Sequence, residues 1–504
     1  MIVPTRAGKL RGVRRRQGFV FKGIRYARPL EGGRRFAPPE PVPSWQGVRE
    51  AAHSSLACPQ RPPVQLPIRG LIGVLGGEHG PDSLALDVWT PALDARRRPV
   101  MVWIHGGAFV MGRGSTSLYA GRRLSLRGDV VVVTLNYRLG ALGFLDLSSI
   151  SRDWTANLGV RDQIAALEWV RDNIDAFGGD PDNVTIFGES AGGMSVGTLL
   201  GTPAAKGLFH RAIAQSGAAH NVSSPERAGQ VAESFLQGLG VRGADRDALE
   251  KVDMEKLLDA QRETTIRLGL RSGDMPWQPS QDGDLLPGSP LEAIAKGLSR
   301  DVPLLVGTNR DEWNLFSFAD VRRLDEAGLR RRFQRALPGR DARGTPLADL
   351  AFDAYRSAGR STAPRDRWSA FMTDRIFRYP ALRLAELQAE HNSRTYSYLF
   401  GWRPPLLPRR VGACHGLEIP FVFGTLRDPL LRPVLGTAGG ARRLSDAMQD
   451  AWVMFARSGD PSHPSLPSWP AFEAGNQATL FLGRRPHVRE SAFAAARQFW
   501  AALP

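Results

Sequence analysis

The residues best suited to covalent chemistry in this chain surround Ser190. Residues 188–192 read Gly-Glu-Ser-Ala-Gly, directly after the apolar run Val184–Phe187 and before a segment with helical spacing. A serine on such a strand–turn–helix has its hydroxyl lifted clear of the sheet, and its neighbours must be very small to avoid collisions. The pattern predicts a nucleophilic serine, with the amide of Ala191 free at a helix N-terminus where negative charge is stabilised. A turn without chemistry could carry the same five residues, so other segments must supply partners.

A serine hydroxyl needs a base that takes its proton and an acid that orients this base. Where the serine lies on a turn of this kind, the acid and then the histidine follow it in the chain. Four histidines lie far enough downstream: His391, His415, His463 and His487. The first, third and fourth lie in polar or surface-like segments. We expect His415 to be the base, because it lies in the small-residue loop Gly-Ala-Cys-His-Gly.

Two adjacent carboxylates, Asp311 and Glu312, follow an apolar run that ends near Asn309. Their position after a predicted strand and before His415 suits the acid. Spacing does not choose between them, and one of the two is expected to cap the helix that follows.

An upstream loop offers donors for a developing oxyanion. Residues 103–109 read Trp-Ile-His-Gly-Gly-Ala-Phe and follow an apolar run. Consecutive small residues let backbone amides converge on one oxygen, and each such donor contributes ~3 kcal/mol of transition-state stabilisation. His105 within this loop is expected to be structural.

The elements that must position these residues alternate between strand and helix. The runs 99–104 and 130–135 are continuously apolar and rich in β-branched residues, as in parallel strands buried on both faces. Residues 162–177 have helical spacing, and 302–306 form another short strand candidate. The alternation predicts an α/β fold with a large, mostly parallel sheet between helices. We expect one domain over 1–504, with cap-like helical insertions around 220–300 and 317–395.

Composition restricts the class of protein. The chain has 504 residues, 42% of them hydrophobic, and a net charge of +16. No apolar run approaches the ~20 residues that span a bilayer, and the first residues lack the apolar core of a signal peptide. The positive charge comes mostly from scattered arginines, which favours a solvated surface over nucleic-acid or stable membrane binding. Two distant cysteines argue against a disulfide framework, so we expect a cytoplasmic protein.

Several motifs in this order resemble the type-B carboxylesterase family, the cholinesterase-like branch of the α/β hydrolases, and in particular bacterial para-nitrobenzyl esterases. The resemblance covers almost the whole chain. It is carried by residues 21–27, 136–140, 177–181, 188–193, 215–217, 311–312, 415–418 and 452–461. It implies an α/β-hydrolase fold and a serine carboxylesterase that hydrolyses small-molecule carboxylic esters through an acyl-enzyme intermediate, without a metal or cofactor.

The resemblance also assigns roles to individual residues. It makes Glu312 the acid of a Ser-Glu-His triad with Ser190 and His415. It places the oxyanion donors on the amides of Gly107, Ala108 and Ala191. A supporting polar network behind the triad falls on Glu189, Ser216 and Glu418.

Two of the chain's departures from the family pattern concern Trp313 and Cys58. The position after the triad glutamate is usually glycine, whereas here it is Trp313, which could narrow the pocket. Phe316, one helical turn beyond Glu312, is a candidate wall residue. The early Cys58 lacks the partner that it has in secreted relatives, because that segment reads Asp-Ser-Leu at 82–84. The expected disulfide therefore cannot form, in line with a reducing compartment.

The sequence leaves several alternative functions open. A lipase or polyester-degrading role is possible within the hydrolases, and by family analogy the oxyanion loop could admit esters of tertiary alcohols. A non-catalytic binding role would be the different class, since the fold also serves in adhesion, although such relatives typically lose the serine. The natural ester and the choice between monomer and homodimer are left open.

Overall fold

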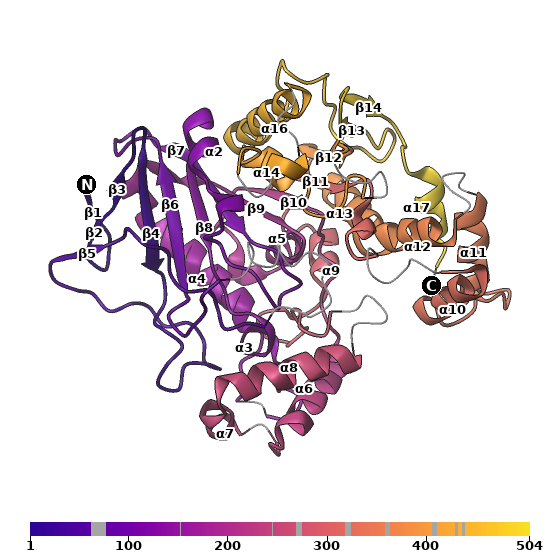
Figure 1. The fold of residues 1–504 in the computed structure, drawn as a ribbon, viewed down its shortest axis with the longest axis horizontal. Helices are drawn as coiled ribbons and strands as arrows, with labels where there is room; N and C mark the ends of the chain where they lie inside the picture. The colour runs from indigo at the N-terminus through magenta and orange to yellow at the C-terminus, as the bar shows by residue number, and fades with distance from the viewer. Residues whose placement is uncertain are drawn as a thin grey trace.

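The computed structural model describes residues 1–61, 77–151, 153–243, 245–268, 275–317, 324–357, 363–405, 411–428, 432–435 and 439–503 (Figure 1). Within these residues, eleven strands form one sheet in the order β14-β13-β12-β11-β10-β9-β7-β8-β6-β4-β3. Their bounds are Val13–Arg14 (β3), Phe19–Arg25 (β4), Ala85–Thr90 (β6), Arg98–Ile104 (β7), Val131–Leu135 (β8), Gly179–Glu189 (β9), Arg211–Gln215 (β10), Leu304–Asn309 (β11), Thr395–Phe400 (β12), Thr479–Leu482 (β13) and His487–Arg489 (β14). A small second sheet contains β1 (Ile2–Pro4), β2 (Lys9–Arg11) and β5 (Val48–Glu50).

The centre of the large sheet is parallel and its edges are antiparallel. Strands β8, β7, β9, β10, β11, β12 and β13 pair in parallel, whereas β6, β4 and β3 on one side and β14 on the other pair antiparallel. All of β7 and β8 is buried. Because side chains alternate along a strand, Val100 and Val102 pack into one core and Met101 and Trp103 into the other. The predicted sheet, covered on both faces, is confirmed.

Helices cover the two faces of the sheet (Figure 1). One face packs against α2 (Arg122–Gly128), α14 (Ile419–Val422), α15 (Arg432–Leu435) and α16 (Gly439–Ser458). The other packs against α3 (Gly140–Phe144), α4 (Leu158–Asn173), α5 (Ala191–Leu200), α9 (Pro290–Ala295) and α13 (Tyr379–Ala389). The helix expected over 162–177 begins earlier, at Leu158, and ends at Asn173, where a 3₁₀ turn (η2, Ile174–Phe177) continues it.

Further helices come from the segments predicted as insertions. The helices α6 (Pro225–Leu239), α7 (Arg246–Lys251) and α8 (Met254–Leu268) lie at one end of the molecule (Figure 1). The helices α10 (Glu326–Ala336), α11 (Leu347–Ser357) and α12 (Pro364–Thr373) share an apolar cluster with the last helix, α17 (Ala494–Ala501). A π-helical turn, η5 (Asp374–Arg378), joins α12 to α13. Short 3₁₀ turns are η1 (Ser117–Tyr119), η3 (Pro203–Ala205) and η4 (Glu312–Asn314). The assignment of all these segments to one domain with a cap stays a prediction.

The parallel strands bring the candidate residues to one edge of the sheet. Strand β7 ends at Ile104, β9 at Glu189 and β11 at Asn309, and these three strands run in the same direction. The candidate oxyanion loop (residues 105–109), Ser190 and the pair of Asp311 and Glu312 follow these ends directly. In open α/β sheets this carboxyl edge is where ligands bind.

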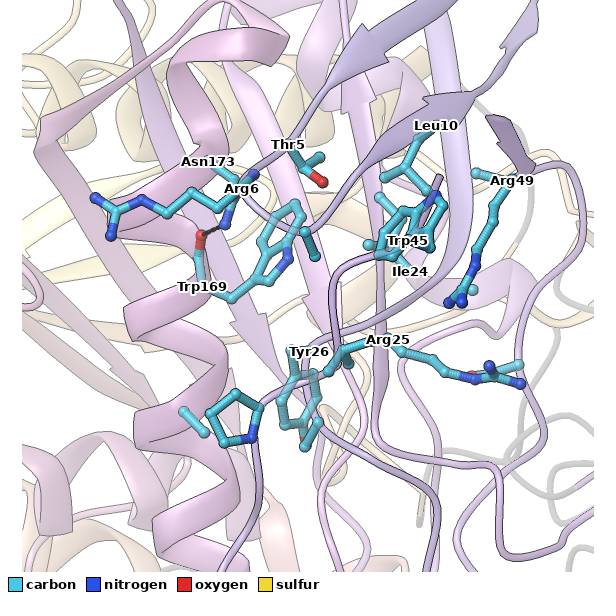
Figure 2. A pocket seen from close by; sticks show the side chains of 18 of the residues that line it. Thr5, Arg6, Leu10, Ile24, Arg25, Tyr26, Trp45, Arg49, Trp169 and Asn173 are labelled. Carbon is cyan, nitrogen blue, oxygen red and sulfur yellow. Dashed lines mark hydrogen bonds between the residues drawn. The ribbon is translucent and has the colours of Figure 1, made fainter. Parts of the chain in front are cut away.

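A pocket of about 530 Å³ lies elsewhere, between the small sheet, β4 and α4 (Figure 2). Trp45 and Trp169 contribute to its lining, and the backbone N–H of Arg6 donates to Asn173 Oδ1 at 2.8 Å. None of the described residues that line it belongs to the candidate catalytic set. This pocket is therefore separate from the candidate catalytic residues at the sheet edge.

Candidate active site

Ser190 occupies a strained turn between β9 and α5. Its φ of 59° and ψ of −126° are unfavourable for a residue with a Cβ, and such strain is concentrated at functional sites. The turn is held because the Ser190 N–H donates to Gln215 O at 3.0 Å. A Cβ at Gly192 would collide with the carbonyl of Ile104, so glycine is required there. Ser190 is half-buried and therefore accessible to a substrate.

The two adjacent carboxylates, Asp311 and Glu312, have different contacts in the structure. Glu312 is fully buried, and its Oε2 lies 2.7 Å from Nδ1 of His415. The carboxylate of Asp311 instead accepts hydrogen bonds from the Arg310 side chain and from the backbone N–H of Ala413, at 2.8 Å each for the shorter contacts. Of this pair, only Glu312 contacts His415. Asp311 instead binds the backbone of the loop that precedes His415.

The side chain of His415 is 7% exposed and lies between acidic and aromatic groups. Its Nδ1 faces Glu312, and its Nε2 lies 3.2 Å from Glu189 Oε1. Within the described residues, Ser190 Oγ forms no hydrogen bond, so its pairing with Nε2 would have to form when substrate binds. Catalytic hydrogen bonds are often long before substrate is present.

Burial and the neighbouring charges shift the pKa of His415 in opposite directions. Burial lowers the pKa of His415, but the negative charges of Glu189 and Glu312 and the hydrogen bond to Glu312 outweigh it and raise this pKa above its usual value. For Glu189, burial raises the pKa of the carboxyl group, and repulsion by Glu418 and Glu312 adds to this increase. Glu189 and His415 therefore compete for one proton, and their titrations are coupled. When Glu189 holds the proton, the imidazole is neutral and can act as a base.

The small-residue loop after β7 exposes its amides. Gly107 has a φ of 118°, and a Cβ there would collide with the carbonyl of Met111. Ala108 and Phe109 also have positive φ values, of 53° and 61°. Among the described residues, no acceptor pairs with the N–H groups of Gly107, Ala108 or Ala191. A Cβ at Gly106 would lie 2.9 Å from that of Ser190, which places this loop beside the serine.

His105, in the same loop, is buried. Burial lowers its pKa to about 4, and its ring stacks on Tyr137 with centroids 4.5 Å apart. The ring is therefore neutral at physiological pH and packed against Tyr137, which suits the structural role expected for it.

A polar network supports Glu312 from the side opposite His415. Glu312 Oε1 accepts from Ser216 Oγ at 2.6 Å and from the Asn309 N–H at 2.7 Å. The Asn309 side chain donates to Glu418 Oε2 at 2.5 Å, and Gln215 donates to Glu418 Oε1 at 3.2 Å. Ser216 and Glu418 thus lie in the predicted region. Asn309 and Gln215 were missed by sequence reasoning, although their positions at the ends of β11 and β10 could have suggested them.

Aromatic rings border the imidazole. Phe316 lies 5.2 Å from the His415 ring and Trp313 lies 4.8 Å from Phe316, measured between centroids. Phe377 is closer to His415, at 4.7 Å, and stacks on Phe316 at 6.3 Å. Trp313 and Phe316 therefore lie beside the candidate triad. Phe377 lies 61 residues after Phe316, in the π-helical turn η5. It had no local signal in the sequence, because only the fold brings this turn beside His415.

Comparison with known proteins decides the family. The sequence profile of the carboxylesterase family matches residues 1–500. The chain belongs to the carboxylesterase family. It is 41% identical to a para-nitrobenzyl esterase of Bacillus subtilis (strain 168) over 484 residues, which cover 95% of this chain and 94% of the relative. It is 33% identical to a phenmedipham hydrolase of Pseudarthrobacter oxydans over 502 residues, covering 96% and 95%.

Solved structures agree with this membership of the carboxylesterase family. A thermophilic PNB esterase superposes with a TM-score of 0.89 at 39% identity, covering 99% of each chain. The Geobacillus stearothermophilus carboxylesterase EST55 at pH 6.2 has a TM-score of 0.87, also at 39% identity and 99% coverage of each chain. The predicted α/β-hydrolase fold is confirmed. The protein is a carboxylic ester hydrolase of the serine-hydrolase type that acts on small-molecule esters.

Within the ranges that the structure describes, none of the helices is long and apolar enough to cross a membrane. Within the same ranges, no group of three or more histidine, cysteine, aspartate or glutamate side chains is arranged to hold a metal ion.

Proposed function

We propose that Ser190 is the nucleophile, His415 the general base and Glu312 the acid of this carboxylesterase. The observation that carries the proposal is the 2.7 Å contact between His415 Nδ1 and the buried Glu312, beside the strained turn of Ser190. A carboxylate on Nδ1 holds the imidazole in the tautomer whose Nε2 accepts a proton, and it stabilises the imidazolium that forms.

Each step of the reaction has a residue to perform it. Ser190 Oγ attacks the ester carbonyl carbon while its proton passes to Nε2 of His415. The carbonyl oxygen becomes an oxyanion that accepts hydrogen bonds from the amides of Gly107, Ala108 and Ala191. His415 then gives its proton to the alcohol oxygen, the C–O bond breaks, and an acyl-enzyme remains.

The second half of the reaction repeats these roles. His415 takes a proton from water, whose oxygen attacks the acyl carbon. The second oxyanion collapses, the bond to Ser190 Oγ breaks, and the serine recovers its proton from the imidazolium. In the supporting network, Ser216 and Asn309 hold the Glu312 carboxylate in place.

Esters with an aromatic alcohol portion are the proposed substrate class. The oxygen of the leaving alcohol must come within hydrogen-bond reach of Nε2 to receive its proton. The rings of Phe316 and Phe377 pack against the same imidazole, so the group attached to this oxygen would border them. The para-nitrobenzyl group in the name of the Bacillus subtilis relative is aromatic, which supports this substrate class.

The test of the assignment uses Ser190→Ala. We expect the purified protein to hydrolyse para-nitrophenyl acetate and to be labelled at Ser190 by a fluorophosphonate probe, with both properties lost in the variant. Near-parental turnover by Ser190→Ala would refute the assignment of the nucleophile.

The proposal also includes a cytoplasmic setting and a monomer or homodimer. Both cysteines, Cys58 and Cys414, are free and buried, which suits a reducing compartment. Burial raises the pKa of the Cys414 thiol to about 12, so a nucleophilic role beside His415 is disfavoured. Fractionation of cells and light scattering of the purified protein test the location and the oligomeric state.

A further inference from the structure

The last helix of the chain is connected to the active site by buried polar side chains. The connection begins at Trp500 on α17, whose Nε1–H donates to the hydroxyl of Tyr355 at 2.9 Å. The Tyr355 hydroxyl donates in turn to Asp374 Oδ2 at 2.9 Å. Asp374 is the first residue of the π-helical turn η5. Trp500 and Asp374 are 8% and 6% exposed, so solvent contributes little to either bond.

Arg378, the last residue of the same turn, carries the connection to β11. Its guanidinium donates to Asp374, and its Nη2 donates to the carbonyl of Arg310 at 2.8 Å. Arg310 lies two residues before Glu312. The guanidinium also stacks over Phe493, the residue just before α17, at 4.9 Å from the ring centroid. Arg378 is therefore held by the residue that precedes the last helix and, through Tyr355 and Asp374, by Trp500 of the helix itself.

Phe377, adjacent to Arg378 in the same turn, packs against His415. Its ring centroid is 4.7 Å from that of the imidazole, and the side chain is buried. A π-helical turn is rare and costs backbone stability, so it persists only where surrounding contacts maintain it. Here the hydrogen bonds of Asp374 and Arg378 are buried, and they restrain both ends of the five-residue turn.

We propose that α17, acting through Trp500, Tyr355, Asp374 and Arg378, positions Phe377 beside His415 and thereby sets selectivity for the alcohol portion of the ester. The inference rests on the proposed function, because the alcohol is placed beside Phe377 by the role of His415 as proton donor. The four residues touch no substrate and are positioning residues. The selectivity of this esterase is therefore controlled in part by its C-terminal helix.

The test uses variants that break the connection and retain an aromatic ring at each substituted position. Trp500→Phe removes one hydrogen bond, whereas Tyr355→Phe removes two and retains the ring. Gln498→Ala, at an exposed position on α17, is the matched control. Two series are measured by acid release: methyl and benzyl acetate, which differ in the alcohol, and para-nitrophenyl acetate and butyrate, which differ in the acyl group.

We expect the benzyl-to-methyl ratio of kcat/KM to fall about fivefold in Trp500→Phe, the effect of one typical hydrogen bond, and further in Tyr355→Phe. The butyrate-to-acetate ratio should stay within twofold of the parent in both, and Gln498→Ala should change neither ratio. A melting temperature for each variant shows which of them remain folded, and Trp500→Phe supplies the result if Tyr355→Phe does not.

Three outcomes would overturn the inference. Unchanged ratios in Trp500→Phe would show that the connection does not reach the alcohol site. Equal changes in both series would indicate general loosening of the fold. A parent protein whose hydrolysis survives Ser190→Ala would overturn the proposed function as well, whereas the first two outcomes leave that function intact.

Discussion

Replacing Glu312 with glutamine should abolish most of the activity, because both oxygens of this carboxylate accept hydrogen bonds. Oε2 faces His415 Nδ1 at 2.7 Å, and Oε1 accepts from Ser216 Oγ and the Asn309 N–H. A glutamine amide must direct its NH₂ group at one of these donors. If it faces His415, the imidazole must place its own proton on Nε2 and can no longer accept one from Ser190. If it faces Asn309, two N–H groups oppose each other in a fully buried site.

The size of the loss follows from the change of tautomer. In a serine hydrolase triad, converting the acid to its amide lowers kcat by about 10⁴-fold, because the base has the wrong tautomer and its cation is not stabilised. This corresponds to ~5 kcal/mol of transition-state stabilisation. Asp311→Asn is the matched control, since Asp311 contacts Arg310 and the Ala413 amide but not His415. Asp311→Asn should lower kcat by less than tenfold.

The assay is kcat for para-nitrophenyl acetate at saturating substrate, with far-UV circular dichroism and a melting temperature to show that each variant is folded. A folded Glu312→Gln that retains activity within tenfold of the parent would refute the role of this carboxylate. So would an Asp311→Asn variant that loses more activity than Glu312→Gln.

Other substitutions test the oxyanion loop, the coupled titration and the core. Gly107→Ala should lower kcat about 10²-fold, since the added Cβ displaces an oxyanion donor. Gly475→Ala, at a glycine with open space around it, should leave kcat unchanged. Equal kcat values for the two variants would contradict the role of the loop. Glu189→Gln removes a negative charge that raises the pKa of His415, so the acid limb of the kcat/KM profile should move to lower pH, and a shift to higher pH would be inconsistent with the coupling. Asp162→Asn leaves a fully buried arginine unpaired and should lower the free energy of unfolding by about 3–5 kcal/mol, measured by urea denaturation; a change below 1 kcal/mol would argue against it.

Local sequence patterns predicted the fold because its central strands are buried on both faces. Runs such as those that became β7 and β8 are apolar throughout, and this pattern occurs where a parallel strand lies between two helical layers. Element bounds were less accurate. The helix α4 begins four residues before the expected start because Leu158 and Val160 are buried by tertiary packing, a contribution that periodicity alone does not reveal.

The candidate nucleophile and the loop of amides could be located from the sequence because each is a contiguous motif. A turn that requires Gly188 and Gly192 leaves a visible pattern, and so does a run of small residues after a strand. The carboxylate was different, since Asp311 and Glu312 are adjacent and both follow β11. Residue spacing left them equivalent, and the resemblance to a family selected Glu312. The contact of its carboxylate with His415, 103 residues away in the chain, is supplied by the fold.

Local sequence therefore determined the types of element, the strained serine turn and the class of chemistry, because these depend on short-range sterics and on hydrophobic burial. The tertiary structure decided which groups meet. It brought Glu189 to within 3.2 Å of His415 Nε2 and placed Phe377 against the imidazole through a π-helical turn. It also connected Trp500 to that turn. These contacts join segments that are up to 226 positions apart, and they exist only because parallel strands and packed helices bring distant side chains to one edge of the sheet.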